Sequence, residues 1–308
     1  VLDQVWDLST TDPDALTPPV DPYAEGWREL TASLVFGSSG TALGQLQSPR
    51  GIAVGPEGFI YVADSGNHRI QKFTPNGQAV AAWGRESTVE TETGAPQGFL
   101  EPWDVAVAPD GAIYVADTWN HRIQRLDSSG NLLDAWGAFG QYKPEDPAGQ
   151  GLFYGARGVA VNASGRVYVA DTGNKRVQVF EPDGTFAFQW GGGGVVEGYL
   201  DEPVGVAFGP AGKVYVADTW NRRVQVFDEN GVFLRQWPIA GWDVGHGEEK
   251  PYLAVDSKGY VYVTDPAHYR VLVFDSEGNY TLSFGQYGFD DRSFAFPTGI
   301  ALGQDDSI

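Results

Sequence analysis

The sequence predicts an all-β fold built from a ring of similar units, and three observations support this prediction. A segment recurs along the 308 residues at spacings of 47 to 54 residues. The chain has 41 Gly and 19 Pro without any collagen period, which indicates many tight turns. Each unit contains four short strand-like runs separated by turn residues, and no helical period is present. This arrangement is typical of a β-propeller blade, and the units count to six.

The four runs of a unit can be recognised in order. The first is a short apolar run such as GIAV at residues 51–54, and the second reads IYVAD or a close variant. The second runs end at an aspartate: Asp64, Asp117, Asp171, Asp218 and Asp265. Five residues after each aspartate, an arginine opens the third run: Arg69, Arg122, Arg176, Arg223 and Arg270. A turn with Gly leads to the fourth run, which ends at an aromatic residue: Phe36, Trp83, Trp136, Trp190, Trp237 and Phe284. The runs show little apolar–polar alternation, as expected for sheets buried on both faces.

The two ends of the chain are expected to share the sixth blade. The strand ending at Phe36 supplies its outer strand and residues 297–302 supply its inner strand, which closes the ring. Ile308 aligns with Ile60, so the two middle strands of this blade have no counterpart after residue 302. We expect the natural chain to continue beyond Ile308, so that the 308 residues end within blade six, with residues 1–30 filling the gap as the alternative. Residues 1–30 are rich in Pro and are predicted to form an extended arm or linker, and residues 31–308 the propeller.

The repeated stretches resemble the NHL-repeat family. The matching stretches are ADSGNHRIQKF from Ala63, ADTWNHRIQRL from Ala116, ADTGNKRVQVF from Ala170, ADTWNRRVQVF from Ala217 and the weaker TDPAHYRVLVF from Thr264. This resemblance covers residues 34–308 and implies a six-bladed propeller. It leaves the function open, because the family uses the ring as a binding platform, as an RNA reader and occasionally as a lyase.

The charge of the chain argues against a polyanionic partner. The chain has 20 Lys and Arg residues and 40 Asp and Glu residues, which gives a net charge of −20. Nucleic acids and anionic lipid surfaces are bound mainly by basic residues, so neither is an expected partner. The chain has no Cys, which excludes disulfides and thiolate metal sites, and no apolar run of the roughly 18 residues that a membrane span needs. Because the chain starts at Val1, we expect an upstream segment or anchor to have been removed, as in an extracellular or cell-surface bacterial protein.

The repeated Asp, Arg and Asn residues are interpreted as architecture. Each Asp is expected to accept backbone N–H groups at its turn and to pair with the Arg five residues later. The Asn residues, such as Asn67 and Asn120, are expected in the left-handed conformation of a tight turn. An active site is rarely copied five times around a ring, so these residues are not candidates for chemistry.

Departures from the repeat are the better candidates for function. Trp119 and Trp220 replace small residues in the loop between the second and third strands, where a Trp can stack on a sugar ring or a partner side chain. The connections at residues 85–101 and 138–155 are longer than the others and acidic. Arg50, Trp103 and Arg157 begin consecutive first strands near the channel mouth, where they suit a carboxylate or phosphate. The predicted ligand-binding residues are Trp119, Trp220, Arg50, Trp103, Arg157 and Asp104.

A non-catalytic module that binds protein or glycan is therefore the preferred function. The alternative is a metal-assisted hydrolase or lyase with its site in the central channel around Asp104, which replaces a repeat Gly. The zinc-dependent amidating lyases of the family take metal-binding His residues from the starts of the first strands. The corresponding residues of this chain cannot serve as those ligands: Arg50, Trp103, Arg157, Val204, Pro251 and Thr298. No cofactor is expected, although calcium stays possible; a single carboxylate is too little for a cation that takes six to eight oxygens.

Overall fold

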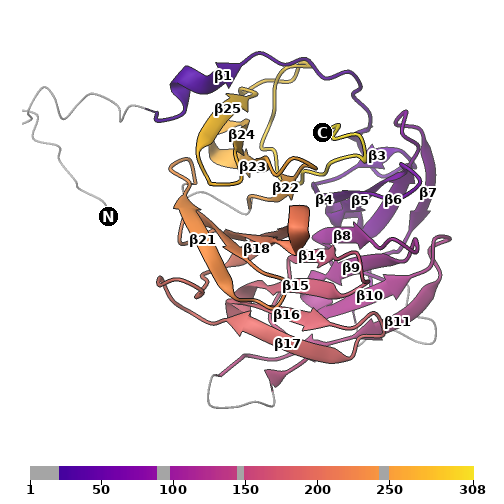
Figure 1. Cartoon of the computed structure of the whole chain (residues 1–308). Helices are drawn as coiled ribbons and strands as arrows, with labels where there is room; N and C mark the ends of the chain where they lie inside the picture. The colour runs from indigo at the N-terminus through magenta and orange to yellow at the C-terminus, as the bar shows by residue number, and fades with distance from the viewer. Residues whose placement is uncertain (1–20, 89–97, 144–148, 243–249) are drawn as a thin grey trace, which may run out of the picture.

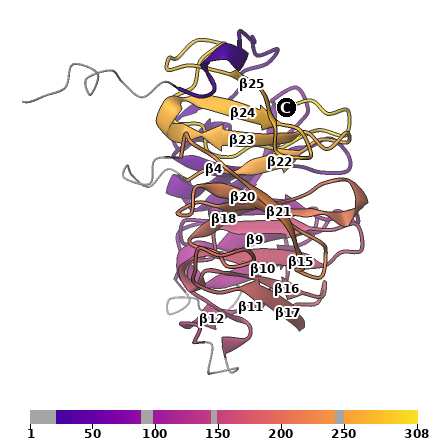
Figure 2. The same cartoon turned by 60° about the vertical axis from the view of Figure 1, so that its left-hand side comes forward.

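The computed structural model describes residues 21–88, 98–143, 149–242 and 250–308. Within them, five sheets, each built from four antiparallel strands, follow one another around a central axis (Figure 1), and the last sheet also pairs with the short N-terminal strand β1 (Trp27–Arg28). In Figure 2, β22 (Leu253–Val255) and β24 (Arg270–Phe274) of the last sheet lie above β9 (Ile113–Asp117) and β10 (Arg122–Leu126) of the second. The first strands of neighbouring sheets lie next to one another and surround the axis. The chain is thus an all-β propeller, as predicted.

Each sheet runs from its first strand at the axis to its fourth strand at the outside. The first contains β4 (Pro49–Val54), β5 (Ile60–Asp64), β6 (Arg69–Phe73) and β7 (Ala79–Trp83). The second contains β8 (Asp104–Val107), β9 (Ile113–Asp117), β10 (Arg122–Leu126) and β11 (Leu132–Trp136). The third contains β14 (Gly158–Val161), β15 (Val167–Asp171), β16 (Arg176–Phe180) and β17 (Phe186–Gly191). The fourth contains β18 (Pro203–Phe208), β19 (Val214–Asp218), β20 (Arg223–Phe227) and β21 (Phe233–Pro238). The fifth contains β22 (Leu253–Val255), β23 (Val261–Asp265), β24 (Arg270–Phe274) and β25 (Tyr280–Phe284).

Short elements lie in the connections between these strands. Four 3-10 helices join second to third strands: η4 (Ser65–Asn67), η5 (Thr118–Asn120), η7 (Thr172–Asn174) and η9 (Pro266–His268). The turn before β19 contains η8 (Pro210–Gly212), and residues near the N-terminus form η3 (Ala24–Gly26). Two parallel pairs lie in the blade-to-blade connections: β2 (Ser38–Ser39) with β3 (Gln45–Leu46), and β12 (Ala138–Phe139) with β13 (Leu152–Phe153).

The left-handed residue of the repeated turn is not the predicted one. Asn67 and Asn120 end their 3-10 helices, and the residue after each takes the positive φ, 54° at both His68 and His121. The Asn keeps a helical backbone conformation, in which its side-chain amide donates a hydrogen bond to the repeat aspartate. The distance from Asn120 Nδ2 to Asp117 Oδ2 is 2.9 Å.

The repeated Asp–Arg pair holds each blade to its preceding connection, which confirms its structural role. In the third blade, the buried Asp171 accepts hydrogen bonds from Tyr154 N at 2.8 Å and from Arg176 Nε at 2.9 Å. Gln178 also donates to Asp171, at 3.1 Å. Arg176 in turn donates to the carbonyl of Leu152, so one buried ion pair fixes strands β15 and β16 to the connection before β14.

Apolar side chains fill the space between neighbouring blades. Tyr114, Ala116 and Ile123 of the second sheet pack against Val159 and Val167 of the third. The Trp that ends the fourth strand in each of the first four blades lies over the Gly of the last turn in the next blade; examples are Trp83 over Gly130 and Trp136 over Gly184. The core is therefore a ring of repeated inter-sheet contacts and has no single centre.

The predicted sixth blade is not formed, and this is the main correction to the sequence-based fold. The described residues form five blades, each with four antiparallel strands. Residues 297–302 lie beside β4 but form no strand, and Phe36 likewise lies outside any strand. A blade needs two middle strands between its edges, and the described residues supply none at this place.

The described part of the N-terminal arm packs on the fifth blade. Strand β1 (Trp27–Arg28) pairs in parallel with β25, and the buried ring of Tyr23 contacts Phe274 with a centroid distance of 6.0 Å. Residues 1–20, which include most of the Pro residues of the predicted arm, lie outside the described part. No helix within the described residues is long and apolar enough to cross a membrane.

Candidate functional site

Three predicted side chains meet where the first strands begin. Arg50 lies in β4, Trp103 directly precedes β8 and Arg157 directly precedes β14. The Trp103 ring lies between the two guanidinium groups, with Arg50 Cζ at 3.8 Å and Arg157 Cζ at 4.3 Å from its centroid. Cation–π attraction at these distances brings two like charges together around one aromatic ring. The predicted cluster of Arg50, Trp103 and Arg157 at the channel mouth is therefore present in the structure.

Side chains from all five blades complete this site. A cavity of about 230 Å³ is lined by Arg50, Glu101, Trp103, Trp119, Arg157, Glu202 and Lys250. Glu202 Oε2 lies 3.2 Å from Lys250 Nζ and 3.6 Å from Arg157 Nη1. The cavity thus holds three cationic and two acidic side chains, a net positive charge in a chain of net charge −20. We call these seven residues the mouth site.

The predicted tryptophans Trp119 and Trp220 both lie at the mouth site: Trp119 lines its cavity, and Trp220 lies beside Lys250. Trp119 is the middle residue of η5 and is 38% exposed, and its Nε1 donates to Glu101 Oε2 at 3.2 Å. Trp220 is 49% exposed, and Lys250 Nζ lies 5.8 Å from its ring centroid. A second cavity of about 200 Å³ shares Trp119, Arg157 and Glu202 with the mouth site. The rim tryptophans and the channel mouth therefore form one connected surface.

Trp103 carries a buried polar atom at this site. Its side chain is 3% exposed, and its Nε1 has no acceptor among the described residues. A buried indole N–H generally finds a hydrogen-bond partner. The Nε1 atoms of Trp136, Trp190 and Trp237 likewise have no acceptor among the described residues, so at this site it is the flanking guanidinium groups that suit an oxygen-bearing anion.

Asp104 lies below the mouth site and does not line its cavity. Its carboxylate is 6% exposed, and it accepts the backbone N–H of Val105 and of Val159, both at 2.9 Å. Burial raises the pKa of Asp104 to about 8, although the two backbone N–H groups act in the opposite direction. Asp104 therefore joins the first strands of the second and third blades.

Tyr252 closes the channel beneath the mouth site, and sequence reasoning missed it. Its buried hydroxyl donates to the carbonyls of Arg157 at 2.8 Å and Trp103 at 3.2 Å, so the fifth blade reaches the second and third across the axis. Burial raises the pKa of Tyr252 well above its usual value, and the nearby Asp104 adds to this shift. The signal was available, because Tyr252 and Asp104 both replace the Gly that other repeats have at this position.

Lys250 and Glu202 were also missed, since nothing in their local sequence marks them. Glu202 precedes the Pro that opens β18 and has a φ of 46°, as Glu101 before β8 has a φ of 47°. Non-Gly residues in this conformation are uncommon.

The predicted acidic connections fall partly outside the described residues, at 89–97 and 144–148.

Comparisons with known proteins identify the repeats. The family model for the NHL repeat matches residues 46–73, 99–126, 153–180 and 200–227. Protein brain tumor of Drosophila melanogaster is 30% identical over 158 residues, which cover 51% of this chain and 14% of that protein. A probable peptidyl-alpha-hydroxyglycine alpha-amidating lyase of Caenorhabditis elegans is 36% identical over 91 residues, which cover 29% of this chain and 25% of the lyase. The matches thus span about a quarter or less of these two relatives' lengths.

Solved structures share the fold at low sequence identity. A gluconolactonase of Xanthomonas campestris superposes with a TM-score of 0.58 at 17% identity, over 93% of this chain and 94% of that structure. A chain of the nidogen/laminin complex gives 0.57 at 15% identity, over 85% and 88%. Relatives and structural neighbours thus include both binding proteins and enzymes. The family-model matches show that this chain contains four NHL repeats, and the blades that these repeats form belong to a β-propeller.

Proposed function

We propose that this propeller is a non-catalytic binding module that takes a carboxylate-bearing segment of a protein partner at the mouth site. This proposal rests mainly on the stack of Arg50, Trp103 and Arg157, with Lys250 beside it, in a strongly acidic chain. Guanidinium groups bind carboxylates through paired hydrogen bonds. The net charge of −20 disfavours contact of an acidic segment with the rest of the surface and thereby favours the cations of the mouth site.

Trp119 and Trp220 supply the apolar part of the proposed interface. Both rings are exposed on the rim that surrounds the mouth site. Tryptophan and arginine are the residues most enriched among those that dominate binding energy. An acidic segment with aromatic or apolar neighbours therefore fits the surface better than a neutral glycan, which would need the tryptophans but not the cations.

The enzymatic alternative has less support from the geometry. Both Asp104 oxygens accept backbone N–H groups, and the residues that the structure describes contain no group of three or more potential metal ligands among His, Cys, Asp and Glu. Elemental analysis of the purified chain tests this alternative directly. Stoichiometric calcium or zinc would favour the hydrolase or lyase over the binding module.

Selection of a random 12-residue peptide library against the 308-residue chain tests the proposal. We expect enriched peptides to contain Asp or Glu beside aromatic residues. Arg157→Gln and Lys250→Gln should each weaken their binding about tenfold, because each removes one charge-assisted contact of about 1.5–3 kcal/mol. The matched control is Arg235→Gln, since Arg235 pairs with Glu277 on an outer strand and should leave binding unchanged.

The tryptophans are tested with the same selected peptides. The double variant Trp119→Ala, Trp220→Ala should abolish measurable binding while thermal unfolding stays nearly unchanged, because both rings are exposed. Lost stability with retained binding would assign them a structural role. Enrichment of peptides without acidic residues, or no enrichment, contradicts the proposal. Binding of a neutral oligosaccharide that depends on the tryptophans but not on Arg157 would instead show that this surface binds a glycan.

A further inference from the structure

The third blade lacks a pair of rim side chains that the second and fourth blades carry. In the second blade, Trp119 of η5 lies beside Glu101 of the preceding connection, and its Nε1 donates to Glu101 Oε2 at 3.2 Å. The fourth blade has Trp220 and Glu202 at the same two positions. At these positions the third blade has two glycines, Gly173 and Gly155.

The backbone around the two glycines matches that of the blades with the pair. Gly173 N donates to the carbonyl of Tyr154 at 2.9 Å, as Trp119 N donates to its own preceding connection at 3.3 Å. Gly155 has a φ of 63°, close to the 47° of Glu101. Since Glu101 takes this conformation with a side chain, the backbone alone does not require a glycine at residue 155. The third blade thus differs from its neighbours in the absent side chains.

A cavity of about 200 Å³ lies at the place of the missing pair. Its aromatic walls are Trp119 and Tyr154, each 38% exposed. A Cβ added to Gly155 would have only Trp119 within 4 Å among the described residues, with Cζ3 at 3.5 Å. At Gly173 a Cβ would lie 2.6 Å from Tyr154 Cδ1, so the tyrosine ring lies over this glycine. We call this cavity the aromatic slot.

The aromatic slot adjoins the mouth site and continues its positive charge. Trp119, Arg157 and Glu202 line both cavities. Lys175 also lines the slot, and its Nζ lies 2.8 Å from Asp201 Oδ1. Arg157 Cζ lies 5.9 Å from the centroid of the Trp119 ring. A group bound in the slot would therefore lie beside a carboxylate bound by Arg157.

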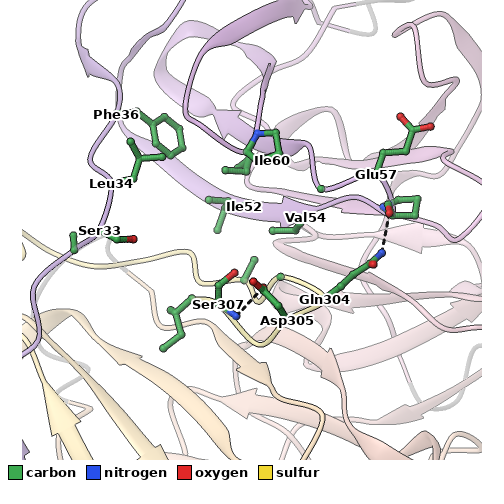
Figure 3. A pocket seen from close by; sticks show the side chains of 17 residues that line it. Ser33, Leu34, Phe36, Ile52, Val54, Glu57, Ile60, Gln304, Asp305 and Ser307 are labelled. Carbon is green, nitrogen blue, oxygen red and sulfur yellow. Dashed lines mark hydrogen bonds between the residues drawn. The ribbon is translucent and has the colours of Figure 1, made fainter.

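A larger hollow of about 630 Å³ lies beside the first blade and suits a different ligand (Figure 3). The charged residues that line it, Glu57 and Asp305, are both acidic, so they disfavour a carboxylate. This hollow shares no lining residue with the mouth site. The aromatic slot is therefore the better place for the apolar part of an acidic segment.

We infer that the aromatic slot receives an aromatic side chain of the partner, carried next to the acidic residue that binds the mouth site. This inference rests on the proposed function and specifies the partner segment, which has Trp, Tyr or Phe directly beside Asp or Glu. The partner's ring takes the place of the missing tryptophan and contacts the rings of Trp119 and Tyr154. Contacts between aromatic rings contribute more than their buried area alone.

Blocked dipeptides test the inference on the 308-residue chain. The probes are acetyl-Trp-Glu-amide and acetyl-Glu-Trp-amide, followed by saturation-transfer difference NMR during a titration. We expect at least one order to bind saturably, with the strongest transfer to the indole protons. The same probe with Ala in place of Trp should bind at least tenfold more weakly. A probe with Gln in place of Glu measures the contribution of the carboxylate and so tests the proposed function separately.

Variants of the slot locate the bound ring. Gly155→Gln fills the slot with a neutral side chain, in a conformation that Glu101 adopts in the second blade, and should weaken the Trp probe at least tenfold. Tyr154→Ala removes one wall at a partly exposed residue and should weaken it about threefold to tenfold. The matched control is Leu34→Asp, which alters the larger hollow and should leave binding unchanged. The unfolding temperature of each variant verifies that it is folded.

Four outcomes overturn the inference. Neither dipeptide binds, or the Ala probe binds as tightly as the Trp probe. Gly155→Gln and Tyr154→Ala bind the Trp probe as well as the parent, or Leu34→Asp abolishes binding, which would place the ring in the larger hollow. Equal binding of the Glu and Gln probes, with the dependence on Gly155 retained, supports the slot and contradicts the carboxylate of the proposed function.

Discussion

Replacing Arg176 with Met should lower the free energy of unfolding by about 3–5 kcal/mol, as expected when one partner of a buried ion pair is removed. Arg176 is 1% exposed and is therefore the most buried of the repeat arginines. The substitution leaves the Asp171 carboxylate buried without its counter-charge. It also removes donors from the carbonyls of Gly149 and Leu152, at 2.7 and 2.8 Å from Nη2. Urea unfolding at pH 7, followed by tryptophan fluorescence, measures the loss.

A surface ion pair of the same blade provides the matched control. Arg166 pairs with Glu181 at 2.9 Å, but both side chains are more than a third exposed. Arg166→Met should therefore change stability by less than about 1 kcal/mol. Burial already raises the pKa of Asp171 while Arg176 opposes the shift, so the cost of Arg176→Met should shrink as the pH falls and the carboxylate becomes protonated. Equal losses for Arg176→Met and Arg166→Met would contradict the role assigned to the buried network.

The repeated part of the fold could be predicted because each copy carries the same information. An Asp that ends one run and an Arg that opens the next occur five times, and each pair forms the same bond, as between Asp64 and Arg69 at 2.7 Å. The strands coincide with the apolar runs because both faces of every sheet are buried between neighbours. The sequence-based prediction was wrong where a single residue determines the backbone conformation. In the repeated turn, for example, His68 and not Asn67 takes the positive φ.

The sixth blade and much of the mouth site could not be predicted from local patterns. A run such as residues 297–302 looks like a first strand, but it forms one only when a second strand pairs with it. Glu202 and Lys250 approach Arg157 because the ring brings different blades to one axis. The cluster of Arg50, Trp103 and Arg157 could be predicted because these residues share one position of the repeat, and Trp119 because it departs from the repeat in its loop.

Asp104→Asn should remove a large part of the pH dependence of stability between about pH 5 and 8. Burial raises the pKa of Asp104 to about 8, whereas the carboxyl of the unfolded chain titrates near 3.8. Between these values the folded state binds more protons than the unfolded state, so stability falls as the pH rises. For this one group the free energy of unfolding falls by up to about 1.4 kcal/mol per pH unit. The asparagine cannot ionise, so the variant should gain stability relative to the parent at each step toward pH 8 and gain no more above it.

Thermal or urea unfolding of both proteins from pH 5 to pH 9 gives the difference curve that isolates Asp104 from other titrating groups. Asp127→Asn serves as the control, because Asp127 is an exposed turn residue whose bonds with Asn131 hold the pKa of its carboxyl below the usual range. Its difference from the parent should stay constant above pH 5. Parallel stability curves for Asp104→Asn and the parent would show that Asp104 is ionised in the folded protein at pH 5. In that case a buried carboxylate would lie directly beneath the mouth site, and its negative charge would oppose the anionic ligand that we propose there.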